Sequence, residues 1–286
     1  MKNLAIVFIS IWLNISLAYC QGRSHQFLFG CFNQPDTFTS ALRGKLIFDI
    51  AGLNIMQDNF GMPFTETQAN ISNENGDLLF ASNGIYIMNS TGGMMLNGGG
   101  LNPGAGASQA QALGMYIQFG NIVLPFPGDS NKYILLHHTS DVGPNYSSNS
   151  LFMTIIDMTL DNGNGAVISK NVVVNSDSCD WGIAACQHAN GRDWWITIPK
   201  AKSDTLITLL CTTAGIFETS RQSFGFPTTL GNVGCPMFSR EGTKFSITST
   251  KPYGSAYKHD VRLYDFDRCS GIFSNAKIDS IDNQVG

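Results

Sequence analysis

Charged residues are scarce in this chain. Lys, Arg, Asp and Glu make up 13% of its 286 residues, against about 25% in an average soluble domain. The net charge is −4, and the basic residues form no cluster, so the composition argues against a nucleic-acid partner. The polar surface must come instead from Asn, Ser, Thr and Gly, a composition typical of exported β proteins.

Motifs for catalysis and metal binding are also lacking. The sequence has no GxSxG, no HExxH, no CxxC and no sialidase-type Asp box. The Gly-rich stretch 96–114 lacks the Gly-Lys-Ser/Thr ending of a phosphate-binding loop, so we interpret it as a surface crossing. The turn 161–165 (DNGNG) offers oxygen donors but lacks the closing Glu of a calcium loop. We predict no metal site and no cofactor, with calcium at this turn as a minor alternative.

A long hydrophobic run occurs once, at the N-terminus. Lys2 precedes the apolar stretch Leu4–Ala18, and small residues stand at Ala18 and Cys20, three residues and one residue before a cut at Gln21. This pattern predicts a secretory signal peptide over residues 1–20. No second run is long enough to span a membrane. We expect a secreted or cell-surface protein with no membrane span after signal cleavage.

Cysteines follow the signal peptide in a number that allows disulfides. Export permits such bonds, and six cysteines allow fifteen pairings. Cys179 and Cys186 flank a Trp-Gly turn and form the nearest pair, so we predict a disulfide between them. The six cysteines are Cys31, Cys179, Cys186, Cys211, Cys235 and Cys269.

Glycine-bearing polar turns recur between short apolar segments. The first turn of each unit contains Gly76, Gly128, Gly191 or Gly242, which lie 52, 63 and 51 residues apart. A second turn follows at Gly92, Gly163, Gly215 or Gly271. Units of about fifty residues in which glycine turns alternate with short apolar segments are typical of propeller blades. We predict an all-β fold, a β-propeller of four-stranded antiparallel blades, with an irregular β-sandwich as the alternative.

The predicted propeller domain covers residues 21–286 and contains about four to five recognisable blades. Two further strands are expected near Phe27 and Leu46. The last residues, Asp279–Gly286, are expected to lack a closing strand, so we expect an incomplete ring and a truncated C-terminus.

Several stretches resemble the large extracellular propeller-like proteins of Bacteroidetes. They are ISNENGDLLFASNGIYIMNSTGGMM, SLFMTIIDMTLDNGNG, CQHANGRDWWITI, MFSREGTKFSI and VRLYDFDRCSG, within Phe48–Ser274. Members of that group often carry a C-terminal sorting domain for type IX secretion or a gliding-motility-associated domain. The resemblance implies a cell-surface propeller and implies no catalytic residues.

Candidate ligand-binding residues gather in one hairpin. They are His188, Arg192, Trp194 and Trp195. We interpret His188 as a residue that ties strand to turn by a hydrogen bond. Trp194 and Trp195 must point to opposite faces of a strand, so one is expected in the core and the other could stack on a sugar or peptide. The favoured alternative is that both lie in the core, because aromatic side chains dominate buried area.

Two functional hypotheses follow. The first is a non-catalytic binding or adhesion module for an extracellular protein or glycan. The second is a secreted polysaccharide hydrolase or lyase with its site at the mouth of the propeller channel. The paired carboxylates Asp265 and Asp267 could serve hydrolysis, but their place before a turn favours a capping role. The missing catalytic motifs favour a protein that is not an enzyme.

Overall fold

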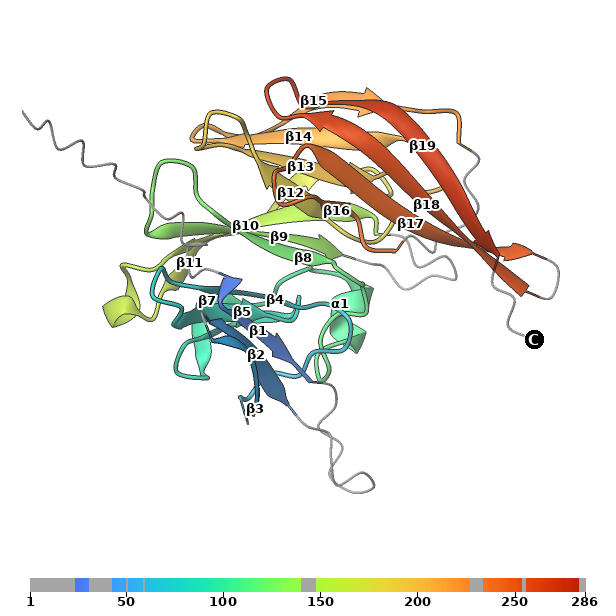
Figure 1. Cartoon of the computed structure of the whole chain (residues 1–286). Coiled ribbons are helices and arrows are strands. Elements are labelled where there is room, and N and C mark those ends of the chain that lie inside the picture. Colours follow the sequence, from blue (N-terminus) through green and yellow to red (C-terminus); the bar gives the residue numbers. More distant parts are fainter. Residues whose placement is uncertain are drawn as a thin grey trace, which may run out of the picture.

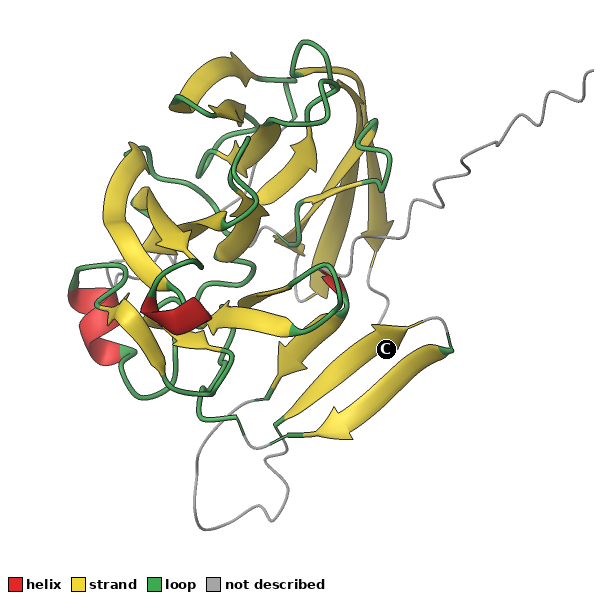
Figure 2. Ribbon diagram, turned by 90° about the vertical axis from the view of Figure 1, so that its left-hand side faces the viewer, coloured by secondary structure: helices red, strands yellow, loops and turns green. Residues whose placement is uncertain are grey.

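The computed structural model describes residues 24–30, 43–49, 51–58, 60–139, 148–226, 234–253 and 256–282. The expected signal peptide, residues 1–20, lies outside these ranges, as does Cys31. Strands make up nearly all of the regular structure, and helix is confined to short segments (Figure 2). The predicted all-β class is therefore confirmed. Among the described residues, no helix is long and apolar enough to cross a membrane.

The strands form five antiparallel units that follow one another along the chain. The first unit is a three-stranded sheet, and the second to fifth units are four-stranded meanders, which we name by their place among the five units. The first sheet contains β1 (Gln26–Phe29), β2 (Gly44–Asp49) and β3 (Gly52–Gln57), and the second meander contains β4 (Ala69–Ser72), β5 (Leu78–Ser82), β6 (Tyr86–Asn89) and β7 (Met94–Gly99). The third meander contains β8 (Asn121–Pro125), β9 (Lys132–Thr139), β10 (Ser150–Asp157) and β11 (Ala166–Asn175). The fourth contains β12 (Ala184–Gln187), β13 (Trp194–Pro199), β14 (Leu206–Thr212) and β15 (Gly215–Gln222), and the fifth contains β16 (Met237–Phe238), β17 (Lys244–Tyr253), β18 (Ala256–Asp267) and β19 (Ile272–Asp282).

The second and third meanders join into one eight-stranded sheet. Strands β7 and β11 pair in parallel through Leu96 and Ala166, while β4 and β8 lie beside each other at the other end. The sheet is therefore nearly closed, like a barrel. The connection from β7 to β8 carries a short helix, α1 (Ala105–Gln109), and that from β10 to β11 carries the 3-10 turn η2 (Asp161–Gly163).

The hydrophobic core is divided among the interfaces between consecutive units. One cluster lies between the first sheet and the second meander, and others lie between the second and third, the third and fourth, and the fourth and fifth meanders. Figure 1 shows the units in chain order across the molecule, from blue through green and yellow to red. Each meander buries an apolar face only by stacking on its neighbours, which both the propeller and the sandwich alternatives require.

The predicted turn glycines mark equivalent positions in all four meanders. Gly76, Gly128, Gly191 and Gly242 lie between the first and second strands, and Gly92, Gly163, Gly215 and Gly271 lie between the third and fourth or begin the fourth. All eight have positive φ, between 70° and 132°, a conformation that costs glycine little. The four-stranded antiparallel units and the positions of their turn glycines are therefore confirmed.

One expectation about the loops was wrong. The stretch 96–114 is not wholly a loop, because Leu96–Gly99 belong to β7 and Ala105–Gln109 form α1. Residues Asp279–Asp282 lie in β19, the fourth strand of the fifth meander, while the incomplete ring and the truncated C-terminus stay predictions. Fourth strands such as β7, β15 and β19 carry many exposed and polar residues, so backbone pairing stabilises them without a clear hydrophobic alternation.

Candidate functional site

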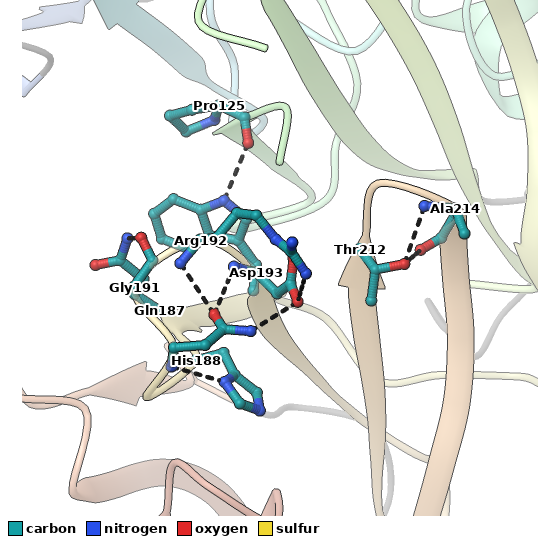
Figure 3. Close-up of polar contacts among 11 residues, drawn as sticks. Pro125, Gln187, His188, Gly191, Arg192, Asp193, Thr212 and Ala214 are labelled. Carbon is teal, nitrogen blue, oxygen red and sulfur yellow. Dashed lines mark hydrogen bonds and ion pairs between the residues drawn. The ribbon is translucent and has the colours of Figure 1, made fainter. Parts of the chain in front are cut away.

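The hairpin between β12 and β13 is built around a polar turn. Asn190 accepts two hydrogen bonds at its Oδ1, from the backbone N–H groups of Arg192 and Asp193, each at 3.0 Å. The backbone N–H of His188 donates to the carbonyl of Asp193 at 2.8 Å, and Gly191 supplies the required positive φ of 73°. The two hydrogen bonds to Asn190 Oδ1 are drawn in Figure 3, and together these contacts hold the turn in one shape.

His188 serves this turn. Its Nδ1 accepts the backbone N–H of Asn190 at 2.9 Å, so the interpretation that it ties strand to turn is confirmed. The imidazole stacks on Trp195 with ring centroids 5.2 Å apart. The backbone carbonyl of His188 accepts a hydrogen bond from the Arg268 side chain of the fifth meander at 3.3 Å. The residue therefore joins two units of the fold.

Arg192 and Asp193 form a two-pronged ion pair on the same turn. Arg192 Nε donates to Asp193 Oδ1 at 2.8 Å and Nη2 donates to Oδ2 at 2.9 Å. The Arg192 side chain is 55% exposed and that of Asp193 only 6%. The hydrogen bonds from Arg192 are the main reason that the pKa of Asp193 lies below its usual value. The buried carboxylate thus orients an exposed guanidinium (Figure 3).

The two tryptophans point to opposite faces of β13, as predicted. Trp195 is 3% exposed, lies between the fourth and fifth meanders, and donates Nε1–H to the Arg268 carbonyl at 2.8 Å. Trp194 is half-buried at the boundary with the third meander, where its Nε1–H donates to the Pro125 carbonyl at 3.0 Å. Trp195 is therefore a core residue, and Trp194 remains available in part to a ligand.

An open cavity of about 760 Å³ lies beside this hairpin. Its walls come from β4, from β8 and the turn after it, and from the β12–β13 hairpin. Among the four predicted residues, Arg192 and Trp194 line the cavity, whereas His188 and Trp195 are not among its lining residues. The cavity thus draws on the first strands of three successive meanders and on the first turns of the third and fourth, which the fold brings together (Figure 1).

Most of the lining residues were not predicted as site residues. Among them are Asn70 on β4, Asp129 in the β8–β9 turn and Gln187 on β12. Asp129 follows Gly128 as Arg192 follows Gly191. Superimposing the repeats on their first-turn glycines would therefore have placed Asp129 and Arg192 at equivalent positions.

The charges on the cavity wall are neutralised locally. Asp129 pairs with Lys132 at 2.9 Å, and this hydrogen bond, with that from the Asn131 N–H, lowers the pKa of Asp129. Arg192 is neutralised by Asp193 in the same way. The wall therefore combines an indole, amides, hydroxyls and two charged side chains, Asp129 and Arg192, each of which is paired with an opposite charge. Such a surface suits a neutral polar ligand.

The histidines of β9 are buried and structural. His137 bonds Asn102 Oδ1 at 2.7 Å and Thr154 Oγ1 at 2.8 Å through its two ring nitrogens, while His138 Nδ1 bonds Ser148 Oγ at 2.8 Å. Burial lowers the pKa of His137 to about 3 and that of His138 to about 4. Both rings are therefore neutral at physiological pH.

The predicted disulfide between Cys179 and Cys186 is wrong. Both side chains are free thiols. Cys179 packs in the core between the third and fourth meanders, whereas Cys186 packs between the fourth and fifth. The fourth meander thus separates the two sulfurs, although the residues are near in sequence. Burial raises the pKa of each thiol to about 12, so neither is a reactive thiolate.

The remaining carboxylates of interest belong to turns. Asp267 caps the turn after β18 by accepting the backbone N–H of Cys269 at 2.9 Å and the hydroxyl of Ser270 at 2.7 Å. Asp265 pairs with Lys244 and Asn275. The turn 161–165 follows β10, and within the described ranges no three His, Cys, Asp or Glu side chains are grouped to hold a metal.

No protein-family model and no curated protein matches this chain. Among solved structures, it is similar to a Bacteroides uniformis "putative 6-phosphogluconolactonase" at 12% identity and a TM-score of 0.45, over 82% of this chain and 63% of that one. It is also similar to a Bacteroides vulgatus member of the DUF4221 family at 10% identity and a TM-score of 0.42, over 90% of this chain and 86% of that one. This chain thus spans less than two thirds of the length of the Bacteroides uniformis protein. With TM-scores below 0.5, these likenesses assign neither a family nor an activity to it.

Proposed function

We propose that this chain is an exported β-propeller that acts as a non-catalytic binding module at the cell surface or in the medium. The observation that carries the proposal is the cavity where Arg192 and Trp194 meet the first strands of two neighbouring meanders. The signal-like N-terminus and the resemblance to extracellular propeller-like proteins of Bacteroidetes, with their type IX secretion domains, support export.

The propeller interpretation rests on the way the units meet. The first strands of neighbouring units lie close together, as β1 with β4, β4 with β8, and β12 with β16. In a propeller the first strands surround the central axis and the turns after them form one rim. The cavity, built from such strands and turns, then lies at the mouth of the central channel.

The ligand that suits this cavity is a neutral, hydroxyl-rich molecule such as a glycan, or a polar loop of an extracellular protein. The half-buried indole of Trp194 offers apolar contact, and Asn70, Gln187 and the exposed Arg192 offer hydrogen bonds. Because Asp129 and Arg192 are each paired with an opposite charge, the site has no excess charge that would favour an ionic ligand.

A glycan array with the purified chain, followed by calorimetry on the glycans it retains, tests the proposal. Arg192→Lys keeps the charge beside Asp193 but loses the planar fork of donors, and we expect binding at least tenfold weaker. The matched control is Arg221→Lys on β15, where Arg221 pairs with Glu218 and Asp177 away from the cavity, and binding should not change. Equal binding by wild type and Arg192→Lys, or no bound glycan at all, would contradict glycan binding at this cavity.

The cavity favours binding over polysaccharide hydrolysis. Glycosidases use two carboxyl groups on either side of the scissile bond, one of them protonated. Among the described residues that line the cavity, Asp129 is the single acidic side chain. Its pKa is lowered by Lys132, which suits a permanent carboxylate and not a proton donor. We expect no release of reducing sugar from any glycan that the array identifies.

A further inference from the structure

The first sheet carries an apolar face that no described part of the chain covers. In the register of β1, β2 and β3, Phe27 lies opposite Leu46 and Leu46 opposite Ile55, while Phe48 lies opposite Leu53. Because residues two apart share a face, these five side chains and that of Phe29 project from the same side. We call this set, Phe27, Phe29, Leu46, Phe48, Leu53 and Ile55, the outer face of the first sheet.

The other side of the same sheet is the one that packs on the protein. Leu28 is 1% exposed and clusters there with Met62, Phe64, Ala81 and Met88. On the outer face, by contrast, the exposed fractions are 45% for Phe27, 48% for Phe48, 54% for Leu53 and 69% for Ile55. The outer face therefore points away from the second meander, which Leu28 contacts from the other side.

We infer that the outer face of the first sheet is the contact surface of a symmetric dimer with a second copy of this chain. A contact of a face with its own copy closes after two subunits. The face carries no charged side chain, so two copies meet without repulsion between like charges. Two such faces would pack as the layers of a β-sandwich, about 10 Å apart.

The opposite end of the stack does not suit this face. The outer side of the fifth meander carries the ion pair of Lys244 with Asp265, and Lys277 lies nearby. Covering these charges with Phe, Leu and Ile would remove them from water without new partners, which is costly. A head-to-tail contact between first sheet and fifth meander is therefore disfavoured, whether it closes one chain or joins several.

The exposed area is close to that needed for a stable dimer. With about 200 Å² for a fully exposed large side chain, Phe27, Phe48, Leu53 and Ile55 expose on the order of 400 Å². An exposed apolar patch of this size is typical of an interaction surface. Two copies with their rims would bury roughly 1,000 Å², the lower bound for a specific interface.

Sedimentation of the full chain between about 1 and 100 µM tests the dimer. We expect the wild type to shift from monomer to dimer within this range. Ile55→Asp places a charge on each copy at the most exposed side chain of the face, on β3, and we expect the dissociation constant of the dimer to rise at least a hundredfold. The control is Leu263→Asp, the same change at another exposed apolar side chain, 49% exposed, on the fifth meander, and this variant should dimerise as the wild type does.

Each other outcome contradicts the inference. A wild type that stays monomeric at 100 µM shows that the face has another occupant or none. If the dimer persists in Ile55→Asp, it forms through another surface. If Ile55→Asp and Leu263→Asp both abolish it, the contact joins the first sheet of one copy to the fifth meander of the other. If Ile55→Asp fails to fold, amide exchange of the wild type decides, because dimerisation must slow exchange in β1–β3 between 1 and 100 µM, and unchanged rates would refute it.

Discussion

Asp180 is a buried carboxyl group whose charge the fold opposes. It is 5% exposed, and its Oδ1 has no hydrogen-bond partner. It lines a cavity of about 20 Å³ between the fourth and fifth meanders, with Arg262 and Asp204. Burial raises the pKa of Asp180 to about 7, and the nearby charge of Arg262 opposes that rise. Near neutral pH this residue therefore lowers the stability of the protein.

Replacing Asp180 with Asn should stabilise the protein in a way that depends on pH. The unfolded carboxyl titrates near pH 4, so the folded state binds its proton more tightly. The stability that this proton binding contributes is complete below about pH 4 and is lost as pH rises to about 7. We expect the variant to unfold like the wild type at pH 4 and to gain up to about 4 kcal/mol at pH 8, measured by urea unfolding.

Asp204 supplies the control, because it lines the same cavity but has a pKa that is lowered and not raised. Burial would raise its pKa, but hydrogen bonds from Ser223 and from the N–H groups of Phe224 and Phe226 outweigh it, and the pKa is lowered. Asp204→Asn should therefore destabilise the protein at pH 8. A stabilisation by Asp180→Asn that is the same at pH 4 and pH 8 would show that ionisation is not its cause.

At the scale of elements, the turn glycines share a backbone role but differ in packing. Gly163, after β10, has a φ of 88°, and a Cβ there would have no neighbour within 4 Å. Gly271, after β18, has a φ of 72°, but a Cβ there would lie 2.5 Å from the Trp195 ring. The second turn of the fifth meander is thus also part of its interface with the fourth.

Two matched substitutions separate these roles. Gly163→Ala should cost about 1 kcal/mol, the strain of alanine at positive φ. Gly271→Ala adds a steric clash with a buried indole and should cost about 2–4 kcal/mol. Thermal unfolding of both variants measures the difference. Equal losses of stability would mean that the Trp195 ring shifts without cost.

At the scale of the whole molecule, burial is uneven along the stack of units. Every residue of β3 is exposed, whereas five of the six residues of β13 are buried. The core between the first sheet and the second meander has five buried residues, and that between the third and fourth meanders has eleven. Because each unit contacts mainly its neighbours, the end with the smallest core is expected to open first.

Hydrogen exchange at about 1 µM, where we expect monomers, checks this order. Amides of β2 and β3 should exchange at least tenfold faster than those of β13 and β14, because their opening exposes little apolar surface. The fifth meander, which has one neighbour but a large aromatic core, should exchange at rates between the two. Uniform protection across all units would indicate one cooperative unit instead.

In the candidate site, features set by neighbouring residues follow from the sequence, whereas features set by contacts between units do not. The turn at Gly191, the structural role of His188 and the opposite faces of Trp194 and Trp195 are properties of a hairpin, and the sequence predicts them. Which indole is buried depends on Pro125 and Arg268, which lie 69 and 73 residues away. The predicted disulfide between Cys179 and Cys186 is wrong because the two residues pack against different neighbouring meanders, on opposite sides of the fourth.

The sequence by itself determined the all-β class, the positions of the turns and the four-stranded unit. Those features depend on glycine φ preferences and on short apolar segments, both of which act within a few residues. Tertiary structure alone decided which residues line the cavity, that the two cysteines stay reduced, and that one face of the first sheet lies open. These depend on contacts between units far apart in the chain, which no local pattern encodes.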